Sequence, residues 1–390
     1  MVLIQVPSAV AQGFDFGPTR LVIIQPTTFC NLDCDYCYLP NRQLKSKFSI
    51  DLLEPIFRNL FSSEFVDKQF TVVWHAGEPL SVPVDFYRTV FDKIEKLNQS
   101  LTNSEYTIRH SIQTNATLIN QAWCDLINEY RVQLGVSLDG PAFLHDAHRK
   151  TRKGTGTHAS VMRGVSFLQR NQIDFKVIAV VTRQSLDYAD EVFDFFVEHQ
   201  IRYVGFNIDE MEGIHDSSSF DYGDLEEKVR KFMKQLYKRS KESNSSLIIR
   251  EFEGAKSFIL GKSDTSKGQF TPFNMINIDH AGNFTTYSPE LLAQTSSIYG
   301  DFILGNVLNT SFDAACETEK FQQMHRDVQS GVERCRKTCQ YFSVCGGGAP
   351  SNKYFENGSF DSSETVYCRY TKQIISEIVL EDLETYLGLR

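Results

Sequence analysis

The chain has 390 residues, of which 41% are hydrophobic and 23% are charged, and its formal net charge is −9 at pH 7. This length predicts a large domain followed by a smaller one, and the acidic balance argues against a nucleic-acid partner, because phosphate binding needs a basic surface. No apolar run is long enough to span a membrane, and the first residues lack the basic start of a signal peptide, so we expect a cytoplasmic protein without a membrane partner.

Strands alternate with helices through the first half of the sequence. Apolar runs predict six strands, at 21–24, 70–74, 106–113, 133–137, 175–181 and 203–208. Amphipathic patterns predict helices near 50–61, 85–97, 121–130, 159–171 and 187–199. These repeats predict an α/β fold with a parallel sheet, as a closed eight-stranded barrel, a partial barrel or a doubly wound sheet. In either barrel the functional loops lie at the carboxyl ends of the strands.

Three cysteines, Cys30, Cys34 and Cys37, follow the first predicted strand. A closed zinc site or a fully ligated [4Fe–4S] cluster takes four protein ligands. Three thiolates therefore leave one iron of a cluster open to a small molecule. A zinc knuckle and buried cysteines without function are the alternatives, but structural cysteines do not usually cluster.

A second group of cysteines lies beyond a predicted β-hairpin at 276–287. Four thiolates close a zinc site or ligate every iron of a cluster, and the glycines at 346–348 suit a close approach of the backbone. The group consists of Cys335, Cys339, Cys345 and Cys368. Cys124 and Cys316 lie in apolar helical contexts, so we expect them to be in the core.

The spacing Cys-x3-Cys-x2-Cys, with Tyr36 before the last cysteine, resembles that of radical S-adenosylmethionine (SAM) enzymes. The resemblance implies a partial (β/α)6 barrel and a [4Fe–4S] cluster whose open iron holds SAM. It also implies an external one-electron donor such as flavodoxin or ferredoxin, and cleavage of SAM to a 5′-deoxyadenosyl radical.

The second cysteine group resembles a SPASM domain, which implies a second, auxiliary [4Fe–4S] cluster in a C-terminal α+β domain. A full SPASM domain supplies eight cysteines for two auxiliary clusters, whereas two of those positions here read Thr286-Tyr287-Ser288 and Ala349. We therefore predict one auxiliary cluster, with zinc as the alternative. The predicted divisions are an extension at 1–20, the barrel with a bridging helix at 21–259, and the SPASM-like domain at 260–390.

Short motifs at successive strand ends resemble SAM-binding segments of the family. The resemblance assigns the SAM ammonium to Gly-Glu-Pro at 77–79, and it places Ser137 near the SAM carboxylate with Arg149 or Arg152 as the charged partner. Polar residues at the end of the third strand would reach the ribose, and residues 181–182 would border the adenine. The candidate residues are Tyr36, Gly77, Glu78, Pro79, Gln113, Asn115, Ser137, Asp139, Arg149, Arg152, Val181 and Thr182.

The substrate is predicted from the sequence segments at 74–80, 135–146 and 345–353, which resemble those of peptide maturases of the glycine-rich-repeat (Grr) type. That resemblance implies a ribosomal precursor peptide and a carbon–carbon crosslink from an aromatic side chain to the Cβ two positions along, a three-residue cyclophane. Asp209, after the sixth strand, is the candidate general base. The alternatives are an anaerobic sulfatase-maturating enzyme, which forms formylglycine, and a non-enzymatic iron–sulfur or zinc protein.

Overall fold

The computed structural model describes residues 16–220, 225–243, 245–262 and 267–389, so most of the predicted 1–20 extension lies outside it. Ten strands form one sheet in the order β12-β9-β8-β1-β2-β3-β4-β5-β6-β7, and β10 pairs separately with β11. The strands are β1 Thr19–Ile24, β2 Val66–Trp74, β3 Thr107–Thr114, β4 Gln133–Ser137, β5 Phe175–Val181, β6 Tyr203–Ile208, β7 Ile248–Ile249, β8 Met275–Ile278, β9 Asn283–Thr286, β10 Thr295–Ser296, β11 Gly300–Asp301 and β12 Gly305–Asn306. None of the helices in the described ranges combines the length and the apolar character needed to cross a membrane.

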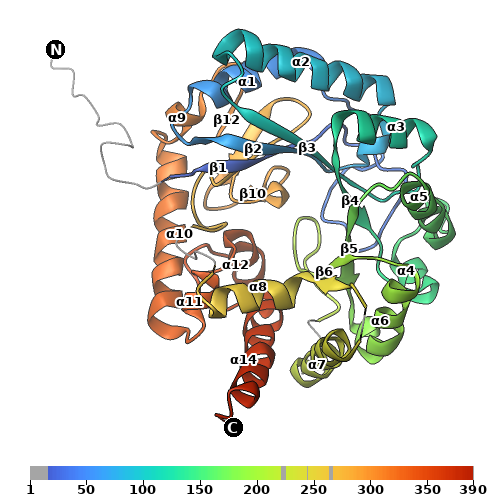
Figure 1. Cartoon of the computed structure of the whole chain (residues 1–390). Helices are drawn as coiled ribbons and strands as arrows, with labels where there is room; N and C mark the ends of the chain where they lie inside the picture. Colours follow the sequence, from blue (N-terminus) through green and yellow to red (C-terminus); the bar gives the residue numbers. More distant parts are fainter. Residues whose placement is uncertain (1–15, 221–224, 244, 263–266, 390) are drawn as a thin grey trace.

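Strands β1 to β6 pair in chain order, and every pair is parallel. All six were predicted, because strands that are buried on both faces of a parallel sheet have nearly continuous apolar sequences. Within the described residues β1 and β6 are not paired with each other, so the sheet is curved but open. Figure 1 shows the helices of the C-terminal part on its open side.

Fourteen α-helices are found in the described residues. They are α1 Leu53–Ser62, α2 Val84–Thr102, α3 Gln121–Tyr130, α4 Ala142–His148, α5 His158–Arg170, α6 Ala189–Glu198, α7 Glu226–Glu242, α8 Arg250–Ile259, α9 Phe312–Ala315, α10 Glu319–Thr338, α11 Phe342–Cys345, α12 Pro350–Asn357, α13 Val366–Cys368 and α14 Ile374–Tyr386. Helix α4 was not predicted, because it is short, buries only Leu144 and His145, and so lacks a periodic apolar face.

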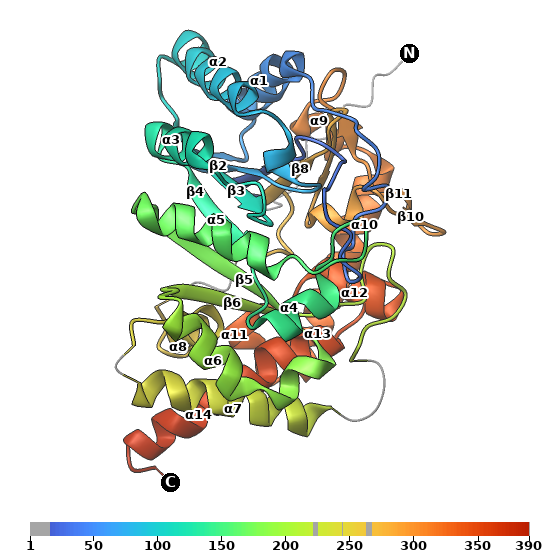
Figure 2. The ribbon, with the colours of Figure 1, turned by 90° about the vertical axis from the view of Figure 1, so that its right-hand side faces the viewer.

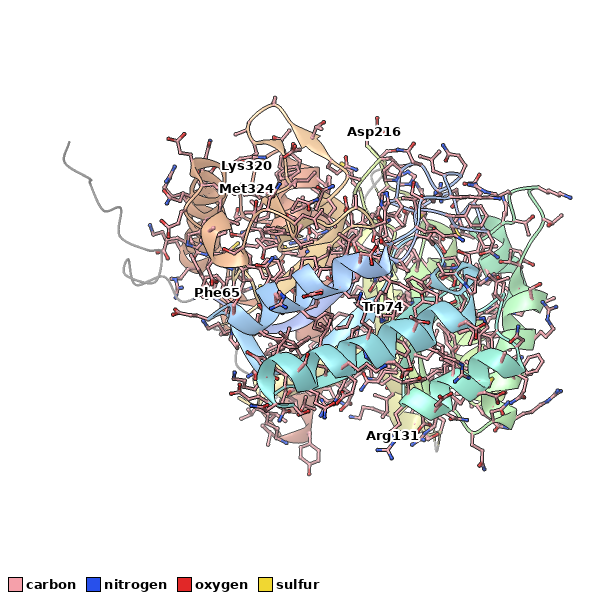
Figure 3. The ribbon with its side chains drawn as sticks, turned by 90° about the horizontal axis from the view of Figure 1, so that it is seen from above. Phe65, Trp74, Arg131, Asp216, Lys320 and Met324 are labelled. Atoms are coloured by element: carbon pink, nitrogen blue, oxygen red, sulfur yellow. The ribbon has the colours of Figure 1, made fainter. Side chains whose placement is uncertain are left out.

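The hydrophobic core lies between the outer face of the sheet and the helices that follow its strands. Helix α2 contributes Tyr87 and Phe91, whose rings lie 5.6 and 6.3 Å from Trp74 at the end of β2. Figure 3 labels Trp74 among these helices, and Figure 2 shows the sheet from the side. The core leaves the carboxyl ends of the strands free to carry polar groups.

The predicted hairpin is present as β8 and β9, and it extends the sheet of the barrel. Strand β8 pairs in parallel with β1, with Leu21 opposite Met275 and Ile24 opposite Ile278. The hairpin is supported both by β1, which provides a partner strand, and by α9, whose Phe312 ring lies 4.9 Å from that of Phe284 in β9. The division at residue 260 stays a prediction.

Candidate active site

One cavity of about 1180 Å³ joins the two cysteine groups. It is lined by residues at the ends of β2, β3, β4 and β6 and by the C-terminal helices. All seven cysteines of the two groups line it, whereas Cys124 and Cys316 do not and are buried, as expected. The cysteine lining consists of Cys30, Cys34, Cys37, Cys335, Cys339, Cys345 and Cys368.

The first cysteine loop is held by hydrogen bonds to its own backbone and to neighbouring loops. The Leu32 N–H donates to Cys30 Sγ at 3.4 Å, and the Arg42 guanidinium donates to the Cys34 carbonyl at 2.7 Å. Burial raises the pKa of the Cys30 thiol, and it raises the pKa of Cys34 to about 11. Thiolates at these positions therefore require a cationic partner, because desolvation disfavours their charge.

Tyr36 is tied to the end of β4 through Asp139. Its hydroxyl donates to Asp139, and Arg149 donates to the same carboxylate from Nε at 2.9 Å and from Nη2 at 3.0 Å. The Val180 N–H adds a further hydrogen bond at 2.9 Å. Burial alone would raise the pKa of Asp139, but the charges of Arg149 and His145 and the hydrogen bonds from Arg149 and Tyr36 together outweigh it and lower the pKa. The cysteine loop, β4 and β5 are thus joined at one buried carboxylate.

The two candidate arginines lie in different places. Arg149 is 8% exposed and lines the cavity. Arg152 lies 4.0 Å from Asp33 and near the ring of Phe29, and it is not among the residues that line the cavity. Arg149 is therefore the arginine that is placed to meet a ligand there.

The Gly-Glu-Pro segment depends on glycine at its first position. Gly77 has φ +66°, and a Cβ there would lie 2.3 Å from the Thr27 carbonyl oxygen and 2.8 Å from that of Phe29. The Glu78 carboxylate accepts from Leu80 N–H at 2.9 Å, Thr114 hydroxyl at 2.6 Å and Asn115 N–H at 2.8 Å. Because three donors already use this carboxylate, it orders the ends of β2 and β3.

The remaining predicted residues divide into two sets. Gln113 donates to the Ser137 hydroxyl at 3.1 Å, and both residues line the cavity together with Asn115. At the end of β5 the cavity is lined by Ile178 and Val180. The predicted residues that do not line it are Pro79, Asp139, Arg152, Val181 and Thr182.

The second cysteine group lies around the C-termini of α10, α11 and α13. Cys335 Sγ lies 3.8 Å from the Gly347 carbonyl, and the Thr365 N–H donates to Cys368 Sγ at 3.3 Å. Burial raises the pKa of Cys368 to about 11. Gly347 has φ +121°, a conformation that favours glycine.

The donor chemistry of both groups fits iron–sulfur clusters, which proteins bind chiefly through cysteine thiolates. In the described ranges no three His, Cys, Asp or Glu side chains gather closely enough to hold one metal ion. A cluster does not require such convergence, because each thiolate binds a different iron. Clusters would draw their charge compensation and amide donors from the loops just described.

The acidic segment after β6 divides between two cavities. Asp209 accepts from the Ser219 N–H at 2.9 Å and lines a smaller cavity, not the one that contains the cysteines. Glu210 and Glu212 line the large cavity, and so does Glu290 from the turn Pro289–Leu291. The predicted base therefore lies outside the main cavity, because β6 ends at Ile208 and the strand alternation stops there.

Sequence reasoning missed Glu290, Tyr38 and His75 as residues of this cavity. The Tyr38 hydroxyl lies 3.2 Å from His75 Nε2, and burial lowers the pKa of His75 to about 4, so this imidazole is neutral. Tyr38 is adjacent to Cys37, and His75 directly precedes the sharp turn at Ala76 and Gly77. Their positions next to the cysteine motif and the Gly-Glu-Pro motif could have indicated that Tyr38 and His75 belong to the cavity. The sequence around Glu290 contains no such indication.

Comparisons with known proteins agree with this arrangement. Residues 24–196 match the Radical SAM superfamily. An uncharacterised protein of Synechocystis sp. is 51% identical over 380 residues, 96% of this chain and 94% of that protein. A serine-type anaerobic sulfatase-maturating enzyme of Bacteroides thetaiotaomicron is 23% identical over 376 residues, 91% of this chain and 88% of that enzyme.

A solved structure shares the fold over nearly the whole chain. Native anSMEcpe with bound AdoMet and Cp18Cys peptide superposes with a TM-score of 0.76 at 22% identity, covering 95% of this chain and 99% of that one. The match to the superfamily, the shared fold and the three-cysteine loop at the end of β1 lead to one conclusion. The chain belongs to the radical SAM superfamily, whose members use SAM together with a [4Fe–4S] cluster.

Proposed function

We propose that this protein oxidises a side chain of a peptide or protein substrate, as the sulfatase-maturating enzymes among its relatives do, with formylglycine formation from serine or cysteine as the favoured reaction. The observation that carries the proposal is the single cavity lined by three cysteines at one place and four at another. A peptide side chain that enters this cavity lies between the two predicted clusters. The named relatives and the superposed structure support this reaction over crosslinking.

The roles proposed for the chain's own residues follow from the contacts. Cys30, Cys34 and Cys37 would hold a [4Fe–4S] cluster, which with SAM supplies a 5′-deoxyadenosyl radical. Arg149, held by Asp139, would meet the SAM carboxylate. The glycine-dependent turn at 77 brings backbone close to the cysteine loop without a side chain between them.

Cyclophane formation is the second candidate, and the end of the hairpin favours it. The place after the hairpin where a full SPASM domain carries a further thiolate reads Thr286-Tyr287-Ser288, which is buried, and the second such place holds Ala349, which is also buried. The resemblance assigns two auxiliary clusters to sulfatase-maturating enzymes, but the cavity offers thiolates for one. The auxiliary cluster, its SPASM-like domain and an external donor such as flavodoxin or ferredoxin belong to both versions of the proposal.

The test is anaerobic reconstitution with iron and sulfide, followed by a chemical reductant, SAM and synthetic peptides. We expect about eight irons per chain, and about four if the second group binds zinc or nothing. A peptide with one central serine should lose two hydrogen atoms and gain a hydrazide-reactive aldehyde. A peptide with an aromatic residue two positions before its partner should lose two hydrogens without gaining an aldehyde if the second candidate holds.

The matched controls are two cysteine variants. Cys34→Ala should abolish SAM cleavage, whereas Cys124→Ala should keep it, because Cys124 is buried outside the cavity. If the reconstituted wild-type protein forms no 5′-deoxyadenosine with reductant and SAM, the enzyme proposal is wrong and an iron–sulfur carrier or zinc protein becomes the better interpretation.

A further inference from the structure

Among the carboxylates of the large cavity that the proposed mechanism does not otherwise use, that of Glu290 stands out by its few contacts. Glu290 lies in the turn Pro289–Leu291 directly after the hairpin, beside Leu291, which is fully buried. Within the described residues its carboxylate accepts a hydrogen bond only from its own backbone N–H. A partly buried carboxylate with free lone pairs in a substrate cavity is able to accept a proton.

Three other titratable groups of the cavity, Glu78, Glu210 and His75, already accept hydrogen bonds or are weak bases. Glu78 accepts from three donors, and Glu210 accepts from Asn352 Nδ2 at 2.5 Å. His75 is a weak base, because burial lowers its pKa. Glu212 belongs to a segment packed on the cysteine loop, where His215 bonds to the Cys37 carbonyl at 3.0 Å.

We propose that Glu290 is the catalytic residue that receives the proton released when the substrate radical is oxidised. This inference rests on the proposed function. Glu290 stands on a turn fixed by the hairpin, which is hydrogen-bonded to β1, and the first cysteine loop follows directly after β1. The carboxylate and the cysteine loop are thus positioned by the same part of the sheet.

The step balances for either version of the reaction. Transfer of a Cβ hydrogen atom breaks one C–H bond of the substrate and forms one in 5′-deoxyadenosine, leaving a carbon radical. That radical then loses one electron to a one-electron acceptor of the iron–sulfur class and one proton to Glu290. The proton leaves an O–H as a C=O bond forms, or it leaves the ring carbon after a new C–C bond has formed.

The surroundings of Glu290 adjust its proton affinity for this step. Burial raises its pKa to about 7, where a carboxylate exchanges protons readily near neutral pH. The groups that face it are Tyr38 on the cysteine loop and Glu210 and Glu212 after β6. Glu356 and Lys372 face Glu210 in turn.

The experiment uses the reconstituted full chain with a serine peptide deuterated at Cβ. Glu290→Gln should still form 5′-deoxyadenosine that carries deuterium, whereas aldehyde formation should fall by about 10²- to 10⁴-fold. Glu290→Asp should recover part of the product, and Glu198→Gln, an exposed residue at the end of α6, should behave as wild type. The loss of product expected on removing a general base is far larger than about threefold. If Glu290→Gln forms product at a rate within about threefold of the Glu198→Gln control, the inference is overturned.

Two further readouts separate the possible failures. Infrared spectra of the unreconstituted protein should show carboxyl groups that titrate near neutral pH, and Glu290→Gln should remove part of that signal. An unchanged signal contradicts the assignment. If wild-type protein transfers no deuterium from the peptide, the proposed function itself is wrong, and the inference falls with it.

Discussion

Replacing Asp139 by asparagine tests whether the buried carboxylate is what joins the cysteine loop to the sheet. Asp139 is 5% exposed and bonded to Arg149, Tyr36 and the Val180 N–H. Asparagine keeps the shape of the Asp139 side chain but removes its negative charge. Its amide NH2 group would face at least one of the present donors and cannot accept a hydrogen bond from it. Loss of one partner of a buried ion pair costs about 3–5 kcal/mol, because the other charge stays buried without compensation.

At an unfolding entropy of about 2.1 cal/mol/K per residue, about 1.2 °C of Tm corresponds to 1 kcal/mol in a chain of 390 residues, so we expect Tm to fall by about 4–6 °C. The assay is thermal unfolding without iron, followed by SAM binding to the reconstituted protein, which should weaken because Arg149 loses its fixed position. The control is Asp174→Asn, which breaks the Arg202 pair at 3.2 Å between side chains that are 89% and 72% exposed. Similar Tm values for the two variants would refute the reasoning.

Three further predictions follow from the same contacts. Gly77→Ala should lose the first cluster and SAM binding, measured by iron content and equilibrium dialysis, whereas Gly261→Ala, with the same φ of +66° and no neighbour within 4 Å among the described residues, should keep both. Arg152→Gln should leave SAM affinity unchanged, because Arg152 does not line the cavity; a loss as large as that of Arg149→Gln would contradict this. Because burial raises the pKa of Glu290 to about 7 and that of Glu210 to about 8, their contribution to stability is complete below the unfolded pKa of about 4.5 and is lost as pH rises through these values. Tm should therefore fall as pH rises from about 5 to about 8, and the fall should be smaller in Glu290→Gln. An equally steep decrease of Tm with pH in the variant would contradict the raised pKa of Glu290.

The parts of the fold and of the site that were predicted correctly are those that a local sequence pattern encodes. The strands at 133–137, 175–181 and 203–208 have the predicted bounds, because each is a short apolar run bounded by polar residues. Six of the seven cysteines were found because they are close in sequence to others of their group, whereas Cys368 lies well beyond Cys345. The shared cavity was harder to foresee, since Cys37 and Cys335 are brought to it by the pairing of β8 with β1, which no local pattern encodes.

The base shows the same limit. Asp209 lies one residue past Ile208, the last residue of β6, so the alternation of the strand does not govern where its side chain lies. Glu290 stands far along the chain, in a polar stretch with no periodicity. Only the register of the hairpin against β1 brings it to the cavity.

The parallel pairing of β1 with β8 also has a consequence for folding of the chain during synthesis. Strand β1 is made first, but the partner on one of its sides is made only after residue 275 leaves the ribosome. Until then that side of β1 is an exposed edge with unpaired backbone groups, which favours association with other chains. A chain truncated at residue 259 should therefore aggregate, and the last third of the sequence is needed to complete the first strand of the sheet.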